Sequence, residues 1–364
     1  MLLLHLDITA DMDDVHRLLS VRCPLGANAG HAPETCACPL TRSFVMYLLG
    51  CPVTDALLEQ WSRHMVSPTA PFYLTDNDLH LLPPTTVLLT RAELAANYSD
   101  LPLEARDSYA TYAVDRSAQW AALVDDWALL ALPASARRSL FRRQWRLGRS
   151  QIYRREVVHE FCGRQAAVLD LWTVDTDDGD MVALHSVTWT TLAAEVRHRW
   201  LSWFVARDDP AGMEASPHDD VEAAWPAMDE PVRAIVRCLA GTFLPHSGPN
   251  CFSTTLAATM PGIGPASAVS RMWLHAAPFA RALAAQGFRS TPFDSPPEAV
   301  APPSVLIWGE DVTVAQHACF VPATGWALNK DAQGWFAPRQ LLPLATIMDR
   351  WRHTGLPLTL YQRG

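Results

Sequence analysis

The C-terminal third of the chain has an order of sequence patterns that restricts it to few fold classes. From Glu230 onward, helical patterns come first and short β-rich runs follow. Helices are expected over 231–240, from 251 to about 261, and over 267–286, and strands over 304–308, 316–321 and 325–330. Helices followed by neighbouring strands are typical of an α+β domain. We therefore expect helices packed on an antiparallel sheet over 230–364, with a last helix at 341–351.

The first 229 residues predict a mixed, helix-rich region and contain no motif that identifies a function. Residues 1–100 read as a mixed α/β region with helices at 11–21 and 55–65, a short apolar segment at 42–49 and two strands within 71–90. Residues 101–229 read as helical from 103 to about 158 with a break at Pro133, then as a β-hairpin of 165–172 and 181–189, a helix at 191–205 and a linker at 208–229. The sequence thus predicts three regions, 1–100, 101–229 and 230–364.

Composition narrows the class of protein. The chain has 364 residues, is 49% hydrophobic and carries a formal charge of −9 from 29 basic and 38 acidic residues. That hydrophobic content excludes a disordered chain, and the acidic balance argues against a nucleic-acid partner. The arginine-rich stretch 137–155 is expected to pair with acidic segments, 175–180 or 208–229, rather than with phosphates.

The N-terminus has none of the features of a secretory signal. It lacks a basic n-region, its apolar run is short, and Asp7 follows at once. No run of 18 apolar residues is present, so no spanning helix and no membrane association are expected. These features predict a cytoplasmic protein, in which the eight cysteines are thiols.

A group of soft ligands near the N-terminus raises the question of zinc. Cys23, His31, Cys36 and Cys38 lie within one loop rich in glycine, proline and alanine. Their spacing differs from the paired Cys-x-x-Cys frame of structural zinc sites. We therefore expect ordinary thiols there, and no metal or cofactor.

Cys251 is the strongest candidate for a nucleophile. Residues 247–251 read Ser-Gly-Pro-Asn-Cys and an apolar helical run follows, which places Cys251 in the first turn of a helix. Unpaired N–H groups and partial positive charge at a helix start favour thiolate over thiol. The same N–H groups can stabilise an oxyanion. The alternative is a buried helical cysteine with a packing role.

His317 supplies a partner for that thiol. It opens the strand after which a turn around Ala323 returns the chain, and a hairpin centred on Ala323 places His317 directly opposite Asn329. A polar partner on one imidazole nitrogen leaves the other nitrogen for the cysteine. A shift of the turn pairs His317 with Asp331 instead, so Asn329 is the first choice for the orienting residue and Asp331 the second.

This arrangement resembles the NlpC-type papain-like cysteine hydrolases. The similarity lies in a cysteine at a helix start, the strand 304–308 with its preceding Pro303, and a histidine at a strand start followed by a polar residue twelve positions later. It covers about 240–350. The family usually has Asp-Cys-Ser-Gly where this chain has Asn-Cys-Phe-Ser at 250–253.

The resemblance implies a thiol-dependent hydrolase of peptidase or amidase type. An amide, peptide or ester would react through an acyl-enzyme on Cys251, with His317 as base and Asn329 orienting it. Two alternatives stay open, an acyltransferase or deamidase on the same scaffold, and an inactive papain-like module that binds a protein or ligand. Several further side chains are candidates for holding an oxyanion or lining the site, with turn formation or packing as the alternative: His246, Ser247, Asn250, Lys330, Asp331, Trp335 and Arg339.

Overall fold

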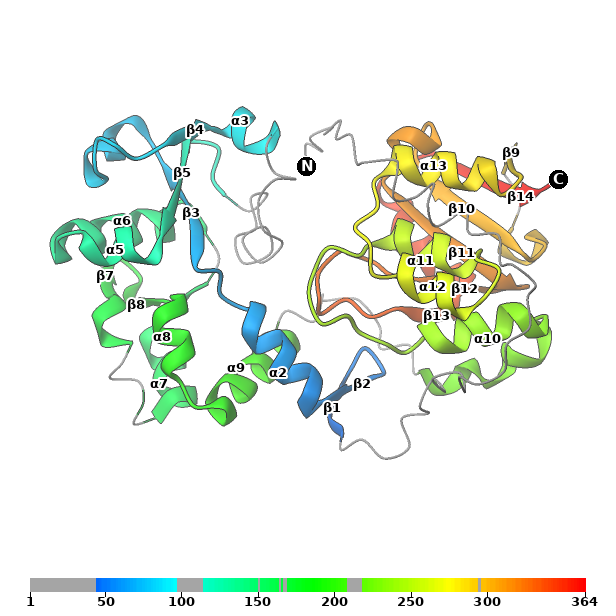
Figure 1. Cartoon of the computed structure of the whole chain (residues 1–364), viewed down its shortest axis with the longest axis horizontal. Coiled ribbons are helices and arrows are strands. Elements are labelled where there is room, and N and C mark those ends of the chain that lie inside the picture. Colours follow the sequence, from blue (N-terminus) through cyan, green and yellow to red (C-terminus); the bar gives the residue numbers. More distant parts are fainter. Residues whose placement is uncertain are drawn as a thin grey trace, which may run out of the picture. The chain divides into compact units, whose positions relative to one another are not determined.

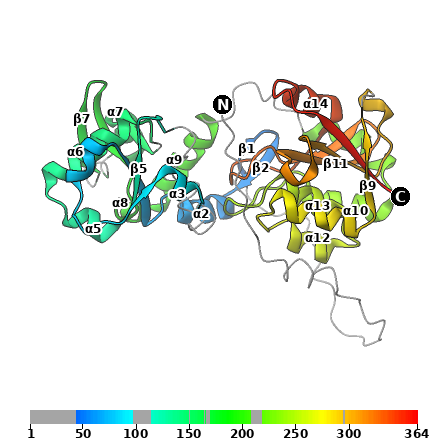
Figure 2. The same cartoon turned by 90° about the horizontal axis from the view of Figure 1, so that it is seen from above.

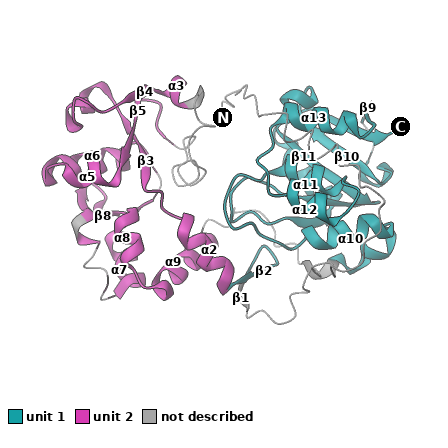
Figure 3. Ribbon diagram, viewed as in Figure 1, with its two compact units in different colours: residues 1–54, 208–364 teal, residues 55–207 magenta. Residues whose placement is uncertain are grey.

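A computed structural model describes residues 44–96, 114–149, 151–163, 165, 169–207, 218–293 and 296–364. Contacts divide the chain into two compact units (Figure 3). Unit 1 comprises residues 1–54 and 208–364, and unit 2 comprises residues 55–207. The boundaries at 54 and 207 differ from those expected from the sequence, which were at 100 and 229. Helices and antiparallel sheets make up both units, which confirms the α+β class. The expected helix at 11–21 lies outside the described residues.

A six-stranded antiparallel sheet forms the centre of the first unit (Figure 1). Its strand order is β13-β12-β11-β10-β14-β9. The strands are β9 (Phe288–Pro292), β10 (Ser304–Trp308), β11 (His317–Ala323), β12 (Trp326–Asn329), β13 (Gln340–Pro343) and β14 (Leu358–Arg363). The expected strand at 304–308 and the hairpin after it are confirmed, and three further strands complete the sheet.

Helices cover both faces of this sheet (Figure 2). They are α10 (Glu230–Leu239), α11 (Cys251–Ala258), α12 (Ile263–Val269), α13 (Ala276–Ala285) and α14 (Leu344–Arg352). Side chains of β11 alternate between the faces, because successive residues of a strand point to opposite sides. Ala318 and Phe320 pack with the α11 core, whereas Cys319 and Val321 pack with Ile347 of α14.

Two helix predictions in this unit need correction. The helix expected over 267–286 is divided, because α12 ends at Val269 and α13 begins only at Ala276. Pro278 lies in the first turn of α13, the one helical position where its missing N–H costs nothing. The helix expected at 341–351 begins at Leu344, because residues 340–343 pair with β12 as a strand.

Unit 2 contains two three-stranded sheets with orders β3-β5-β4 and β6-β8-β7. The strands are β3 (Thr69–Leu74), β4 (Leu88–Thr90), β5 (Trp120–Asp125), β6 (Ile152–Arg154), β7 (Thr173–Thr176) and β8 (Gly179–Ala183). The helices are α2 (Asp55–His64), α3 (Arg91–Ala96), α5 (Asp126–Ala131), α6 (Ala134–Arg146), α7 (Arg155–Cys162), α8 (Ser186–Thr191) and α9 (Ala194–Arg207). Before them, β1 (Phe44–Leu48) pairs with β2 (Cys51–Thr54) in unit 1.

The long helix expected from residue 103 is wrong over 120–125. This segment is β5, the central strand between β3 and β4. Ala121 and Ala122 are both fully buried although they point to opposite faces of the strand. A short run that is apolar on both faces fits a buried strand as well as a helix, and only its neighbours decide between them.

The predicted hairpin around 175–180 is confirmed, but its strands are shorter and displaced. The first strand begins at Thr173, after a 3-10 turn at Asp170–Trp172, and the second ends at Ala183 before α8. The tight turn was predicted in the right place. Gly179 at its end takes a positive φ of 104°, which a non-glycine residue rarely adopts.

The acidic hairpin is also the partner that the arginine-rich stretch was predicted to have. Within unit 2, Arg142 bonds Asp175 at 2.6 Å and Arg146 bonds Asp177 at 3.1 Å. The hairpin turn therefore lies against the arginine face of α6, and these ion pairs occupy charges that a phosphate partner would need.

Candidate active site

Cys251 is the first residue of α11, as predicted. Asn250 caps this helix, accepting from the Ser253 N–H at 3.1 Å, while the Ser253 hydroxyl accepts from the Asn250 N–H at 3.0 Å. The Asn250 amide also donates to the Leu274 carbonyl at 2.7 Å. This reciprocal capping explains why the helix begins here. It also means that Asn250 supports the helix start through both ends of its amide.

Cys251 is buried, with only 7% of the residue exposed. Burial raises its pKa to about 11, while the N–H groups of Ala318, Phe252 and Cys251 itself and the charge of Lys330 act in the opposite direction. The resting thiol is therefore protonated at neutral pH. The N–H of Ala318 belongs to the residue after His317, so the thiol lies against the main chain beside the predicted base.

His317 opens β11 and is fully buried. Its ring stacks on Trp351 of α14, with centroids 4.1 Å apart and planes 10° apart, and Trp308 of β10 lies at 5.2 Å. Burial lowers its pKa to about 4, against the opposing effects of the Asp331 charge and the bond to Asn329. The imidazole is therefore neutral at pH 7.

A chain of polar contacts determines which nitrogen of His317 carries the proton. Arg350 bonds Asp331 at 2.8 Å, and Asp331 accepts from the Asn329 amide nitrogen at 2.7 Å. The Asn329 oxygen therefore faces His317 Nε2, 2.8 Å away, and Nε2 must be the donor. In the neutral ring Nδ1 is then an acceptor, and this buried nitrogen has no hydrogen-bond partner among the residues that the structure describes.

The predicted register of the β11–β12 hairpin is wrong, although the predicted contact is present. The pairs are Phe320 with Leu328 and Ala323 with Trp326, with an irregularity between them. Continued toward His317, the first pair's register brings Asp331, not Asn329, opposite the histidine. Asn329 reaches the ring from the diagonal position, which long side chains span. Asn329 therefore contacts the imidazole directly, and Asp331 holds Asn329 in place.

Thiol and imidazole approach the start of β11 from different sides. Cys251 belongs to the α11 core, whereas Trp308, which pairs with His317, and Trp351, which stacks on it, pack with the α14 core. The described residues include no hydrogen bond between Cys251 and His317. What the structure brings together is the thiol with the Ala318 main chain, and the imidazole with Asn329 and Asp331.

Lys330 is the only lysine of the chain and is 1% exposed. Its ammonium donates to the carbonyls of Ala332 and Gly334, the latter at 2.9 Å. Its charge also acts on the Cys251 thiol. Lys330 comes directly after Asn329, the last residue of β12, so in continued alternation its side chain lies on the opposite face from Asn329, the face of α11.

The segment before Cys251 is bound to the segment after Lys330. The Ser247 hydroxyl accepts from the Trp335 N–H at 2.8 Å, and the Gly248 N–H donates to the Gln333 carbonyl at 3.0 Å. His246 Nδ1 lies 2.9 Å from the Ser247 carbonyl oxygen. Ser247 and Trp335 are buried. These contacts show how the candidate lining residues are held, and they place Ser247 next to the loop that carries Asp331.

Three residues of this network were not identified from the sequence. Trp308 and Trp351 flank the His317 ring, and Arg350 holds Asp331. The alternation of β10 gives Trp308 and His317 a common face once their pairing is known. No local signal marks Trp351 or Arg350, because they come from a helix that was predicted without a contact to this strand.

Comparisons of the chain with protein-family models, with curated proteins and with solved structures found no match. Among the described residues, no group of three potential metal ligands occurs. Cys23, His31, Cys36 and Cys38 lie outside them. No helix in the described part of the chain is long and apolar enough to cross a bilayer.

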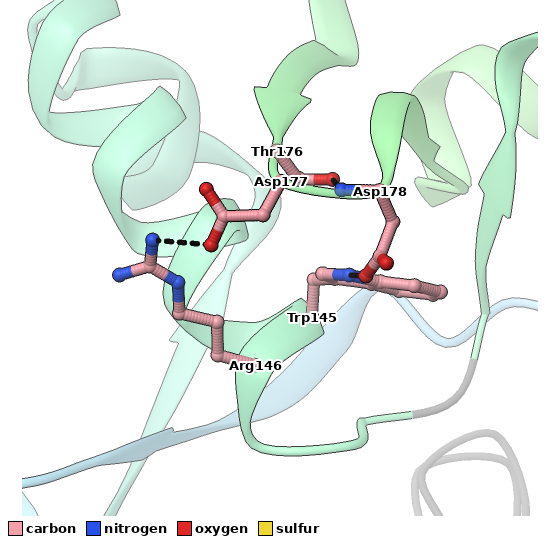
Figure 4. A pocket seen from close by; sticks show the side chains of 5 residues that line it. All are labelled: Trp145, Arg146, Thr176, Asp177 and Asp178. Carbon is pink, nitrogen blue, oxygen red and sulfur yellow. Dashed lines mark hydrogen bonds and ion pairs between the residues drawn. The ribbon is translucent and has the colours of Figure 1, made fainter.

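A surface pocket lies within unit 2 and contains none of the predicted site residues (Figure 4). It is lined by Trp145, Arg146, Thr176, Asp177 and Asp178. Its polar groups already bond one another, since Arg146 pairs with Asp177 and the Trp145 indole donates to Asp178 at 2.8 Å. It is formed by the end of α6 and the β7–β8 turn.

Proposed function

We propose that the protein is a thiol-dependent hydrolase of peptidase or amidase type, with Cys251 as nucleophile, His317 as base and Asn329 as orienting residue. The observation that supports this most is the state of the His317 ring. Its Nε2 is bound to Asn329 and its Nδ1 is an unpaired acceptor, on the residue next to the main-chain N–H that the Cys251 thiol contacts. An oriented ring with an accepting nitrogen is one requirement of a general base, and the proposed reaction also needs Nδ1 to reach the Cys251 proton past the start of β11.

In the proposed reaction, His317 Nδ1 takes the thiol proton as sulfur attacks the carbonyl carbon. The new C–S bond forms while the carbonyl electron pair moves to oxygen. Collapse of the tetrahedral intermediate breaks the C–N or C–O bond, and the imidazolium returns the proton to the leaving group. Water then hydrolyses the acyl thioester, with the same imidazole as base, and frees Cys251.

The oxyanion would be stabilised by main-chain N–H groups at the start of α11. The N–H groups of Cys251 and Phe252 already act on the thiol. They belong to the first turn, whose N–H groups have no partner within the helix. The buried ammonium of Lys330 adds positive charge on the same face of the sheet.

The burial of the site favours a second candidate, an inactive module that binds a partner. Cys251 and His317 are both buried, and burial shifts both pKa values toward the neutral forms. In the hydrolase proposal, access to Cys251 requires movement of neighbouring segments, and residues 331–337, which bond Ser247 and Gly248 just before it, are one such segment. In the alternative, the segment stays closed and the buried pair serves packing.

A thiol-reactive acyl probe separates the two candidates. The hydrolase proposal expects covalent labelling of Cys251 near pH 7 at a rate that His317→Ala lowers, with turnover of a reactive ester lost in Cys251→Ala. Cys162→Ser is the matched control, since Cys162 is also a buried free thiol on a helix. Labelling of Cys251 no faster than that of Cys162, together with ester turnover retained in Cys251→Ala, would reject the hydrolase.

A further inference from the structure

Arg339, one of the residues that the sequence suggested could line the site, is a buried cation that makes none of the contacts described above. It immediately precedes β13 and is 7% exposed. Its N–H and carbonyl pair with Thr242 and Gly241 at 2.9 and 2.7 Å, and its Nε donates to the Thr242 hydroxyl at 3.0 Å. The guanidinium is therefore held in one place, next to the C-terminal end of α10.

No carboxylate balances this charge within the described part of the chain. Arg339 takes part in none of the ion pairs there, and its Nη1 is buried without a hydrogen-bond partner. Burial lowers its pKa to about 10, an effect that Cys238 opposes and the charge of Arg271 increases. A buried charge without a partner is costly, so this position favours an anion supplied from outside.

Arg271 supplies a second positive charge, carried by an exposed side chain, that acts on Arg339. It lies two residues after the end of α12, a helix that packs against α10, and it is exposed. None of the described ion pairs involves Arg271 either. Two positive charges therefore act on each other here, one on a buried side chain and one on an exposed side chain.

The sheet places this positive site at the same end as Cys251. The β12–β13 register ends with Asn329 opposite Gln340, so Lys330 and Arg339 come next on the two strands. Both share the face of Leu328 and Leu341, which pack with the α11 core. Because neighbouring strands are about 4.8 Å apart and β13 is two strands from β11, Arg339 begins about 10 Å from the strand that the Cys251 thiol contacts.

We propose that Arg339 and Arg271 form a subsite for a carboxylate of the substrate, so that the hydrolase acts on amides or peptides that carry a free carboxylate. The carboxylate oxygens would bond Arg339 Nη1 and the Arg271 guanidinium, which hold planar oxyanions well. That the bound carboxylate belongs to a substrate depends on the proposed hydrolase function. Binding of an anion at the two arginines does not depend on it.

Anion binding is tested without any turnover, through Cys238, the half-buried thiol whose charge acts on Arg339. The full chain is alkylated with anionic iodoacetate and with neutral iodoacetamide, and modification of Cys238 is followed by peptide mass spectrometry. N-acetylglycine, inorganic phosphate and chloride are compared as competitors at equal ionic strength. We expect N-acetylglycine to slow iodoacetate severalfold and iodoacetamide much less.

Arg271→Gln should remove this protection with the fold intact, because the side chain is exposed. Arg339→Gln should remove it as well, and the unfolding midpoint of each variant checks that the chain is folded. In the wild type, N-acetylglycine should also raise the midpoint by mass action. Equal protection by chloride, or protection unchanged in both variants, would overturn the anion site. Protection by phosphate and not by N-acetylglycine would overturn the carboxylate assignment.

Turnover then tests the link to Cys251. For matched amide substrates with a free or an amidated carboxyl group, we expect kcat/KM to differ about tenfold, and Arg271→Gln to abolish the difference, as for the loss of one charge-assisted hydrogen bond. Equal kcat/KM for the two substrates in an active enzyme would overturn the subsite as a substrate site. No turnover of either substrate, with N-acetylglycine still protecting Cys238, would overturn the hydrolase and leave the anion site.

Discussion

Two buried histidines, one in each unit, lie in nearly the same aromatic setting. His317 stacks on Trp351 at 4.1 Å and 10°, and His185 stacks on Trp172 at 4.4 Å and 12°. Each ring has its Nε2 close to a side-chain oxygen, 2.8 Å from Asn329 and 2.9 Å from Asp126. In both rings Nδ1 is buried and has no hydrogen-bond partner within the described parts of the chain.

The two sites differ in what accompanies the imidazole. The hydroxyl neighbour of His185, on Ser186, donates to the same Asp126 carboxylate that the ring approaches. That hydroxyl proton is therefore already bound to a stronger acceptor. Beside His317 the thiol of Cys251 lies at a capped helix start, against the Ala318 N–H. A stacked and oriented histidine is therefore compatible with a purely structural role, and the thiol of Cys251 is what distinguishes the surroundings of His317.

The largest expected difference between the two sites is in the reactivity of Cys251. His317→Ala should lower the rate of acyl-probe labelling about 10³-fold, because it removes the proton acceptor, whereas His185→Ala should leave it within about twofold. Labelling is measured by intact-protein mass spectrometry at pH 7, with the unfolding midpoint of each variant as the control for folding. A comparable loss of labelling in both variants would show that the comparison is wrong.

Replacing the carboxylate behind each ring, Asp331 or Asp126, should give the next largest difference in labelling and stability. Asp331→Ala frees the Asn329 amide to rotate and leaves Arg350 half-buried without its carboxylate, so we expect labelling to fall about 10- to 100-fold. The free energy of unfolding should fall by about 3 kcal/mol. Asp126→Ala removes the acceptor of Ser186 and should destabilise unit 2 with labelling unchanged. Urea unfolding and probe kinetics measure both, and unchanged labelling in Asp331→Ala would remove Asp331 from the proposed site.

The loss of stability at acid pH tests whether His317 is neutral in the folded chain. Burial lowers its pKa from 6.5 to about 4, so the unfolded chain takes up a proton at a higher pH than the folded chain does. Stability from this group is complete above pH 6.5 and is lost as the pH falls toward 4, by about 3 kcal/mol in total. His317→Gln should flatten that part of the profile, measured by urea unfolding between pH 7 and 4. An identical acid limb in the variant would contradict the neutral, buried imidazole.

The smallest expected effects come from the stacked indoles. Trp351→Phe and Trp172→Phe should each lower the free energy of unfolding by about 1 kcal/mol, since a smaller ring keeps the stack with less contact. Only Trp351→Phe should change Cys251 labelling, by a few-fold, because only its partner ring belongs to the proposed site. If Trp172→Phe alters labelling and Trp351→Phe does not, the assignment of the two rings is reversed.

Local signals in the sequence were enough for the start of the candidate site. A Gly-Pro turn and an asparagine cap predicted a helix beginning at Cys251, and the structure has that helix with its reciprocal cap. The strand 304–308 and the arginine–aspartate pairing of unit 2 were predicted in the same way. Each of these features depends on chemistry within a few residues, or on an excess of one charge that needs the other.

Contacts between distant segments were beyond such signals. The strand Trp120–Asp125 was predicted to be helical because its apolar residues fit either period, and pairing with β3 and β4 decided the outcome. Strands β9, β13 and β14 were missed because short, partly polar runs become strands only when a neighbour offers its hydrogen bonds.

The sequence by itself determined the class of the fold, the capped helix that presents Cys251 and the presence of His317 and Asn329 on adjoining strands. Only the tertiary structure decided the hairpin register, the stacking of Trp351 on His317 and the order Arg350, Asp331, Asn329, His317. The physical reason is range. A helix cap closes its hydrogen bonds within three residues, whereas the tautomer of His317 depends on an arginine that the chain reaches only after two further strands and most of a helix.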